Sequence, residues 1–299
     1  MSRIYEALQR AEQERASGMV KETVLDVTEP VVPTVTHAGS AVRSVEPHSP
    51  SALQDNQVSS RALRFEDLRE RCSKPSWKLD PTRNVFGDAN HPVTGAEPFR
   101  RLRSRLYQFR ENRPLRTLLV TSALPTEGKT YVASNLAQAF VRQNGRCALL
   151  IDADLHCPQL HVPFGAASCP GLSDYLRGEA TEISIIQQGA KEDLFFIPAG
   201  NPGSHPTELI GNGRLKVLLE RMTPLFDWII LDSPPTLPVT DASLLARLCD
   251  GVLLIVRAAH TPHEAAQKAC MEFREQNLVG IVLNRAEEGA AHSGYSYYS

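Results

Sequence analysis

Residues 117–136, TLLVTSALPTEGKTYVASNL, decide the fold of this chain. They begin with an apolar run at residues 118–120, which is typical of a strand buried on both faces. An apolar residue then recurs every four positions from residue 132 to residue 140, which predicts a helix. The connecting loop, residues 123–130, contains the Gly-Lys-Thr sequence at its end. The stretch therefore predicts a strand, a glycine-containing loop and a helix in immediate succession.

This loop, ALPTEGKT, is a P-loop with alanine at its first position. Consecutive backbone N–H groups and the start of the following helix would surround a polyphosphate. We expect the Lys129 side chain to reach the β- and γ-phosphates and the Thr130 hydroxyl to bind Mg²⁺. An ordinary turn is the alternative, but the motif has the strand and helix that it requires. The predicted nucleotide-binding residues are Thr126, Glu127, Gly128, Lys129, Thr130 and Tyr131.

Two further buried strands end in acidic residues. One apolar run leads into Asp152 and Asp154, whose side chains share a strand face because they are two positions apart. Another run ends in Asp232, at the position where a Walker B carboxylate holds Mg²⁺ directly or through water. Ligands bind at this carboxyl end of parallel strands, although solvated loop acids remain the alternative for the first pair. Alternating strands and helices predict an α/β fold, a doubly wound, mostly parallel sheet of the P-loop NTPase type.

Composition limits the other classes of function. The 299 residues carry a net charge of −2, so no global attraction to nucleic acid or membrane is expected. No apolar run approaches the ~18 residues of a membrane span, and the first residues lack a signal-peptide core, so we expect a cytoplasmic protein. The six cysteines should be reduced there. His156, Cys157, His161 and Cys169 fit no standard zinc spacing.

The chain divides into four predicted parts. Residues 1–16 form a short amphipathic helix, either a frayed terminus or a docking helix. Residues 17–90 are rich in proline and poor in aromatics, which predicts a mostly disordered linker with a helical turn or more over residues 61–72. Residues 91–288 form the P-loop domain, and residues 289–299 form a tail.

Within the domain, two local patterns make further predictions. Residues 206–226 have the apolar spacing of one continuous helix, with Pro206 in its first turn. Thr261, Pro262 and Glu264 predict a capping box at the start of a later helix.

Two surface features lie outside this core. The helix over residues 97–112 carries Glu97, Arg100 and Arg103 as a ridge turned away from its apolar stripe. Such a ridge is either a solvated face or a contact with another subunit. Three of the seven tyrosines lie within the last five residues of the chain, in an exposed segment rich in Gly and Ser.

Together, the loop at residues 123–130, the acids at residues 151–155, the segment at residues 230–235 and the tyrosine-rich end resemble the bacterial tyrosine autokinases of exopolysaccharide and capsule export. The first residues are similar to the exosortase-associated subgroup. The resemblance implies ATP and Mg²⁺ as cofactors and a homo-oligomeric ring beside a membrane chain-length regulator. It also implies a resetting protein-tyrosine phosphatase, no nucleic acid partner, and a cytoplasmic protein held peripherally at the inner face of the plasma membrane.

The resemblance also implies residue roles. Lys129, Asp152 and Asp154 would be catalytic, with either aspartate as base or metal ligand, and Asn284 would face the adenine. Thr130, Asp152 and Asp232 would bind the metal. Glu97, Arg100 and Arg103 would mediate oligomerisation. The phosphorylated residues of a neighbouring subunit would be Tyr295, Tyr297 and Tyr298.

The chain departs from the family pattern at two positions. Thr126 stands where glycine is usual, and His156 stands where arginine usually follows the second aspartate by two positions. Two alternative functions therefore stay open. One is a catalytically weak nucleotide-binding scaffold of the export machine, and the other is a partitioning or site-positioning ATPase of the same fold.

Overall fold

We describe the chain from a computed structural model. The structure describes residues 63–86, 95–189, 193–201, 203, 205–274 and 277–286. The predicted N-terminal helix and the three tail tyrosines lie outside the described residues.

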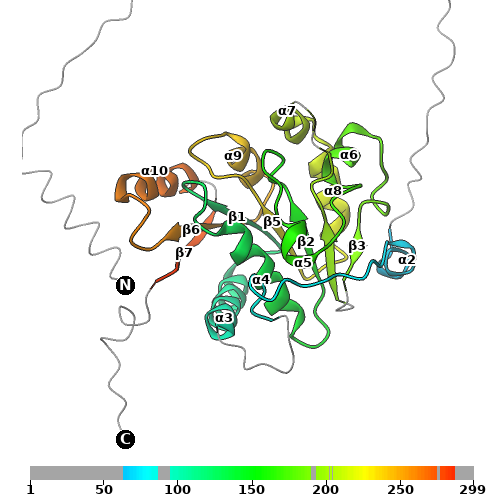
Figure 1. Cartoon of the computed structure of the whole chain (residues 1–299), viewed down its shortest axis with the longest axis horizontal. Helices are drawn as coiled ribbons and strands as arrows, with labels where there is room; N and C mark the ends of the chain where they lie inside the picture. The colour runs from blue at the N-terminus through cyan, green and yellow to red at the C-terminus, as the bar shows by residue number, and fades with distance from the viewer. Residues whose placement is uncertain are drawn as a thin grey trace, which may run out of the picture. The chain divides into compact units, whose positions relative to one another are not determined.

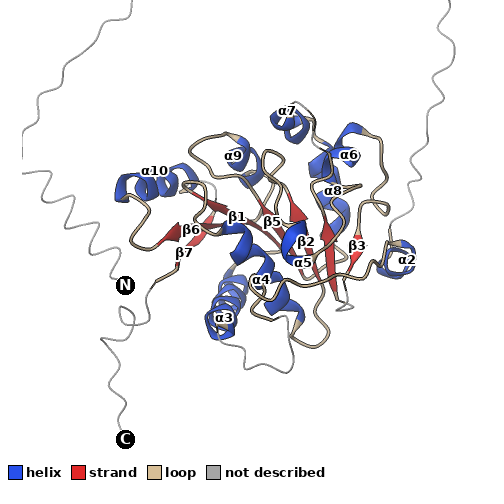
Figure 2. Cartoon of the chain, in the orientation of Figure 1, coloured by secondary structure: helices blue, strands red, loops and turns tan. Residues whose placement is uncertain are grey.

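A seven-stranded sheet forms the centre of the domain, with the strand order β3-β4-β2-β5-β1-β6-β7 (Figures 1 and 2). All neighbouring pairs are parallel except β3 and β4, which run antiparallel. The predicted doubly wound, mostly parallel sheet is confirmed. Its strands are β1 (Thr117–Ser122), β2 (Ala148–Asp152), β3 (Gln187–Gln188), β4 (Leu194–Ile197), β5 (Trp228–Asp232), β6 (Gly251–Arg257) and β7 (Leu278–Asn284).

Helices cover both faces of this sheet (Figure 1). The helices α3 (Ala96–Asn112), α4 (Lys129–Val141) and α5 (His161–Phe164) contribute to the core on one face. The opposite face is covered by α6 (Leu172–Arg177), α7 (Pro206–Gly211), α8 (Arg214–Met222), α9 (Asp241–Ala246) and α10 (His263–Phe273).

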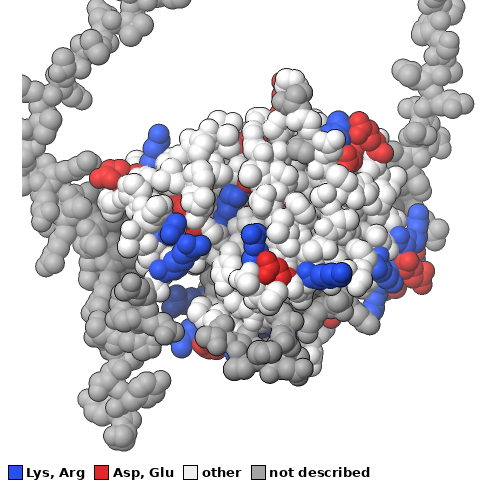
Figure 3. Space-filling view, in the orientation of Figure 1, with Lys and Arg blue, Asp and Glu red and all other residues white. Residues whose placement is uncertain are grey.

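The outer surface carries charged side chains, but they do not gather in one place on the visible face (Figure 3). On the face shown in Figure 3, most described atoms belong to uncharged residues, and basic and acidic side chains are spread over several places. Within the part of the chain that the structure describes, no helix has the length and apolarity needed to cross a membrane.

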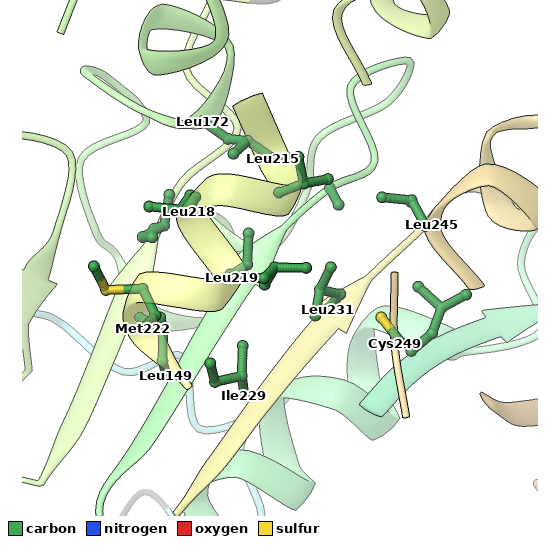
Figure 4. Packing of buried hydrophobic residues seen from close by; sticks show 14 of the residues in the cluster. Leu149, Leu172, Leu215, Leu218, Leu219, Met222, Ile229, Leu231, Leu245 and Cys249 are labelled. Atoms are coloured by element: carbon green, nitrogen blue, oxygen red, sulfur yellow. The ribbon is translucent and has the colours of Figure 1, made fainter. Parts of the chain in front are cut away.

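Alternation along the strands explains why both faces are apolar. Leu149 and Ile151 of β2 face the α8 side, whereas Leu150 between them faces α4. On the side of Leu149 and Ile151, the apolar side chains of α8 pack against the sheet, as Figure 4 shows. These side chains are Leu215, Leu218, Leu219 and Met222, all buried. Burial on both faces makes each central strand a continuous apolar run, which is the signal that identified it.

The prediction of one helix over residues 206–226 is wrong. The structure has two helices, α7 and α8, because Gly213 adopts a left-handed backbone with φ 84° and starts a new helix at Arg214. The apolar spacing continues across the break, since both helices pack on the same side of the sheet.

Folded structure also begins earlier than residue 91. Residues 63–86 form a strap along the domain that starts with the helix α2 (Phe65–Arg71). The Trp77 ring packs against Phe164 and Phe196, with ring centroids 5.1 and 6.0 Å apart. Farther along, Asn135 of α4 accepts a hydrogen bond from the Val85 N–H at 2.8 Å. This part of the predicted linker is therefore ordered, because Trp77 and Phe86 are buried and Phe65 is partly buried against the core.

Candidate active site

The P-loop connects β1 to α4 and ends in an unusual backbone conformation. Thr126 and Gly128 both have left-handed φ values, 65° and 97°. Gly128 is the residue immediately before α4, so the first N–H groups of the helix point out of its start. An anion is the natural partner of such groups, since the helix dipole adds partial positive charge there.

Three carboxylates lie at the adjoining edge of the sheet. Asp152 ends β2 and Asp232 ends β5, and the two are direct register partners in neighbouring parallel strands. Asp154 follows two positions after Asp152. The three residues are 0%, 1% and 2% exposed for Asp152, Asp232 and Asp154. The structure therefore brings together all three acids that were predicted from separate stretches of sequence.

Two residues at the start of α4 contact these acids. The Lys129 ammonium forms an ion pair with Asp154 Oδ2 at 2.8 Å, and both side chains are largely buried. The Thr130 hydroxyl donates to Asp232 Oδ2 at 2.7 Å. The phosphate-binding loop and the acids thus form one connected site.

The remaining carboxylate oxygens differ in their partners. Both oxygens of Asp152 accept backbone N–H groups, from Asp154 at 3.2 Å and from Leu160 at 3.0 Å. Asp154 Oδ1 accepts the Cys157 N–H at 3.0 Å. Asp232 Oδ1, in contrast, is buried and has no hydrogen-bond partner among the described residues. A buried oxygen left unpaired is costly unless another group, such as a cation or its water, binds it.

The charges of the site are unbalanced, which shifts several pKa values. Burial raises the pKa of Asp232 to about 6, against the opposing effects of Lys129 and Thr130. Burial and the Asp232 carboxylate hold the pKa of Asp152 well above its usual range. Burial lowers the pKa of Lys129, but Asp232 and Asp154 outweigh it and raise that pKa overall. One lysine faces three carboxylates, so the site has room for more positive charge.

Magnesium suits this arrangement. No group of three or more His, Cys, Asp or Glu side chains in the described ranges forms a ready metal cage. Mg²⁺ does not need one, because it usually binds through one or two carboxylates, with waters and substrate phosphates completing its shell. Thr130 and Asp232, with its unpaired oxygen, fit that requirement.

The other predicted nucleotide-binding residues lie around the loop. The Asn284 amide donates to the Glu127 carbonyl at 2.8 Å, and its own carbonyl accepts the Arg285 N–H at 3.0 Å. The Tyr131 ring is half-buried and meets Phe99 of α3 edge-on, with ring centroids 5.8 Å apart. Asn284 therefore contacts the P-loop backbone itself, at the end of β7.

A fourth buried aspartate, Asp241, had no role assigned to it from the sequence. This residue, at the start of α9, is fully buried and accepts one hydrogen bond from the Thr207 hydroxyl at 2.7 Å. His156 Nε2 lies 2.9 Å from the other oxygen of Asp241. The sequence indicated His156 only as a departure from the family pattern. It gave no reason to single out Asp241, because that residue does not directly follow a strand.

The predicted oligomerisation residues do not form one free ridge. Glu97 pairs with Arg100 at 3.6 Å and with Arg101 at 3.3 Å on the exposed side of α3. Arg103 instead reaches across to α4 and donates to the Ala139 carbonyl at 2.6 Å. Glu97 and Arg100 are therefore available at the surface, whereas Arg103 also holds two helices of its own domain together.

The capping box predicted at Thr261 is also wrong. The residue before α10 is Pro262, and that helix start has no side-chain cap. The Thr261 hydroxyl donates instead to the carboxylate of Glu127 in the P-loop.

Comparisons with known proteins agree with this geometry. No model of a known protein family matches the chain. Tyrosine-protein kinase YwqD of Bacillus subtilis is 31% identical over 218 residues, which are 72% of this chain and 91% of YwqD. Tyrosine-protein kinase Etk of Escherichia coli is 34% identical over 269 residues, 85% of this chain. The chain thus spans nearly all of YwqD but only 36% of Etk.

Solved structures give the same picture. The kinase domain of Escherichia coli Etk is 30% identical, with a TM-score of 0.60 over 69% of this chain and 81% of that domain. The cell division ATPase MinD of Pyrococcus furiosus is 24% identical, with a TM-score of 0.50 over 57% of this chain and 74% of MinD. At that identity the likeness to MinD concerns the fold alone.

Proposed function

Because the chain belongs to the bacterial tyrosine-protein kinase family, we propose that it transfers the γ-phosphate of ATP to tyrosines in the tail of a neighbouring subunit. The proposed acceptors are Tyr295, Tyr297 and Tyr298. A tail flanked by Gly and Ser would reach an adjacent site at high effective concentration when subunits are assembled.

One observation carries the proposal more than any other. Asp232 keeps one oxygen without a hydrogen-bond partner among the described residues, and its other oxygen accepts the Thr130 hydroxyl at the start of α4. Thr130 and Asp232 would hold Mg²⁺, with Asp152 beside them, and the backbone N–H groups of residues 126–131 would bind the phosphates. Bound Mg²⁺ would neutralise charge that develops on the transferred phosphoryl group.

Lys129 and Asp154 would then act together. A phosphate group would offer Lys129 a second anionic partner besides Asp154. The released Asp154 carboxylate would accept the proton of the tyrosine hydroxyl as its oxygen bonds to phosphorus and the bond to the β-phosphate oxygen breaks. Asp154 suits this role better than Asp152, whose two oxygens both accept backbone N–H groups.

The wider role follows from the same family membership. We propose that the chain forms a homo-oligomeric ring through Glu97 and Arg100, with help from Arg103. It would sit peripherally at the inner face of the plasma membrane, held by a membrane chain-length regulator, and a protein-tyrosine phosphatase would reset the tail. Each phosphate adds about −1.5 to −2 charges at neutral pH, so phosphorylated tails would repel one another and open the ring. This cycle would regulate exopolysaccharide polymerisation and export.

Incubation of the purified full chain with γ-labelled ATP and Mg²⁺ tests the proposal. We expect labelled phosphotyrosine in the parent and none when Lys129 is replaced by Ala. ATP turnover without phosphotyrosine would instead favour a positioning ATPase, and nucleotide binding without turnover would favour a scaffold.

A further inference from the structure

The P-loop has one acidic residue, Glu127, whose position is unusual for a charged side chain. It is only 1% exposed although it precedes Gly128 in the phosphate-binding loop. Its Oε2 accepts the Leu124 N–H at 2.9 Å, which closes the loop on itself. Its Oε1 accepts the Thr261 hydroxyl, and its backbone carbonyl accepts the Asn284 amide at 2.8 Å.

Thr261 and Asn284 come from outside the loop. Thr261 lies between β6 and α10, and its hydroxyl oxygen accepts the Arg257 N–H at 3.0 Å. Because that oxygen already accepts a backbone donor, the hydroxyl proton is directed to Glu127. Asn284 ends β7, and its amide nitrogen fills the space that a Cβ on Gly128 would need. A residue in the loop after β6 and the last residue of β7 therefore hold the P-loop from one edge of the sheet.

The loop needs such support because its own sequence does not favour its shape. Thr126 adopts a left-handed φ of 65°, a conformation that β-branched residues rarely adopt. A glycine there would reach this shape without steric cost, whereas threonine must be kept in it by surrounding contacts. The neighbouring residue Glu127 accepts such contacts, as hydrogen bonds from Leu124, Thr261 and Asn284.

We infer that Thr261 and Asn284 are positioning residues that hold the P-loop, through Glu127, in its nucleotide-binding shape. The inference rests on the proposed function in one respect, because it takes nucleotide to be the ligand of the loop. Neither residue needs to touch a phosphate. Their effect is to keep the backbone N–H groups of residues 126–128 in place before nucleotide arrives.

Thr261→Val tests the inference, since valine keeps the shape of threonine but removes the hydroxyl. Thr261→Ser is the rescue variant because it keeps the donor. Thr223→Val is the matched control: that hydroxyl donates to the Leu219 carbonyl at 2.7 Å, at the far end of α8. Calorimetry with Mg·ADP should show affinity about tenfold weaker for Thr261→Val, as expected for loss of a hydrogen bond to a charged group. The serine and control variants should bind like the parent.

Amide hydrogen exchange without nucleotide provides a second, independent measurement. The Leu124 amide should exchange faster in Thr261→Val than in the parent, while amides of β1 and β5 remain unchanged. Parent-like ADP affinity and parent-like Leu124 exchange in Thr261→Val would overturn the inference, as would a serine variant as weak as the valine variant. If the parent itself fails to bind Mg·ADP, the proposed function fails, and the Leu124 exchange still decides whether Thr261 holds the loop.

Discussion

Replacement of Asp232 by asparagine should make the nucleotide-free protein more stable at neutral pH while abolishing its activity. Asparagine keeps the size of the side chain and an oxygen that accepts the Thr130 hydroxyl, but it removes the charge of one of three buried carboxyl groups. In the proposed mechanism that charge serves to bind Mg²⁺, at the expense of stability when no cation is bound.

The expected size follows from the pKa of this carboxyl. It is about 6 in the folded chain, compared with an ordinary value of 3.8. At about 1.4 kcal/mol for each pKa unit, the ionised carboxylate costs about 3 kcal/mol at pH 7.5. The folded state binds the proton more tightly than the unfolded chain, so the stability of the parent falls as pH rises from about 4 to 6. The asparagine variant escapes this loss, and its advantage should shrink to about 1 kcal/mol at pH 4.5.

Urea unfolding at pH 7.5 and pH 4.5, without Mg²⁺ and nucleotide, measures both values. Glu70→Gln, an exposed change on α2, is the control and should alter stability little at either pH. Added Mg·ADP should stabilise the parent but not Asp232→Asn. An asparagine variant that is less stable than the parent at pH 7.5, or a gain that is the same at both pH values, would refute the reasoning.

Three further changes test other parts of the structure. Lys129→Met should lose Mg·ADP binding, as measured by calorimetry. It should also lower the free energy of unfolding by roughly 3 kcal/mol, because Asp154 is left buried without its partner. A parent-like unfolding curve would contradict this. In urea unfolding, Arg103→Ala should lower stability by about 1 kcal/mol, because it loses the hydrogen bond to the Ala139 carbonyl. Arg100→Ala, at an exposed position, should change stability by less than about 0.5 kcal/mol. Equal effects would contradict the different roles of the two arginines. Gly189→Ala should lower the stability by about 1 to 3 kcal/mol, because the new Cβ meets the Trp77 ring of the strap. Gly211→Ala, which meets nothing, is its control, and equal losses in both would show that the strap does not pack on Gly189.

The central strands and the acids that follow them could be predicted from the sequence. Strands buried on both faces must be apolar throughout, so the runs before Asp152 and Asp232 stand out without an alignment. Their side-by-side register could not be predicted, because strand order depends on how the intervening helices pack. The ion pair between Lys129 and Asp154 likewise depends on that order.

Most of the incorrect predictions from sequence concern side chains whose partners lie far away in the sequence. Arg103 was expected to turn away from the apolar stripe of α3, but it lies four residues after Phe99 and three before Leu106, and so beside that stripe. From there it reaches the Ala139 carbonyl. Thr261 has the pattern of a helix cap, yet a buried glutamate far away in sequence is its partner. The strap contains few apolar residues, and its sequence does not reveal that Trp77 has a buried site to fill.

A mixed-subunit experiment tests the proposed transfer between subunits most directly. A Lys129→Ala chain that retains its tail is combined with an active chain ending at residue 286, and labelled ATP and Mg²⁺ are added. Mass spectrometry should find phosphate on Tyr295, Tyr297 or Tyr298 of the Lys129→Ala chain, which cannot have phosphorylated itself. Phosphate found only on Tyr5, Tyr107, Tyr131 or Tyr175, or none on the Lys129→Ala chain, would contradict transfer to a neighbouring tail.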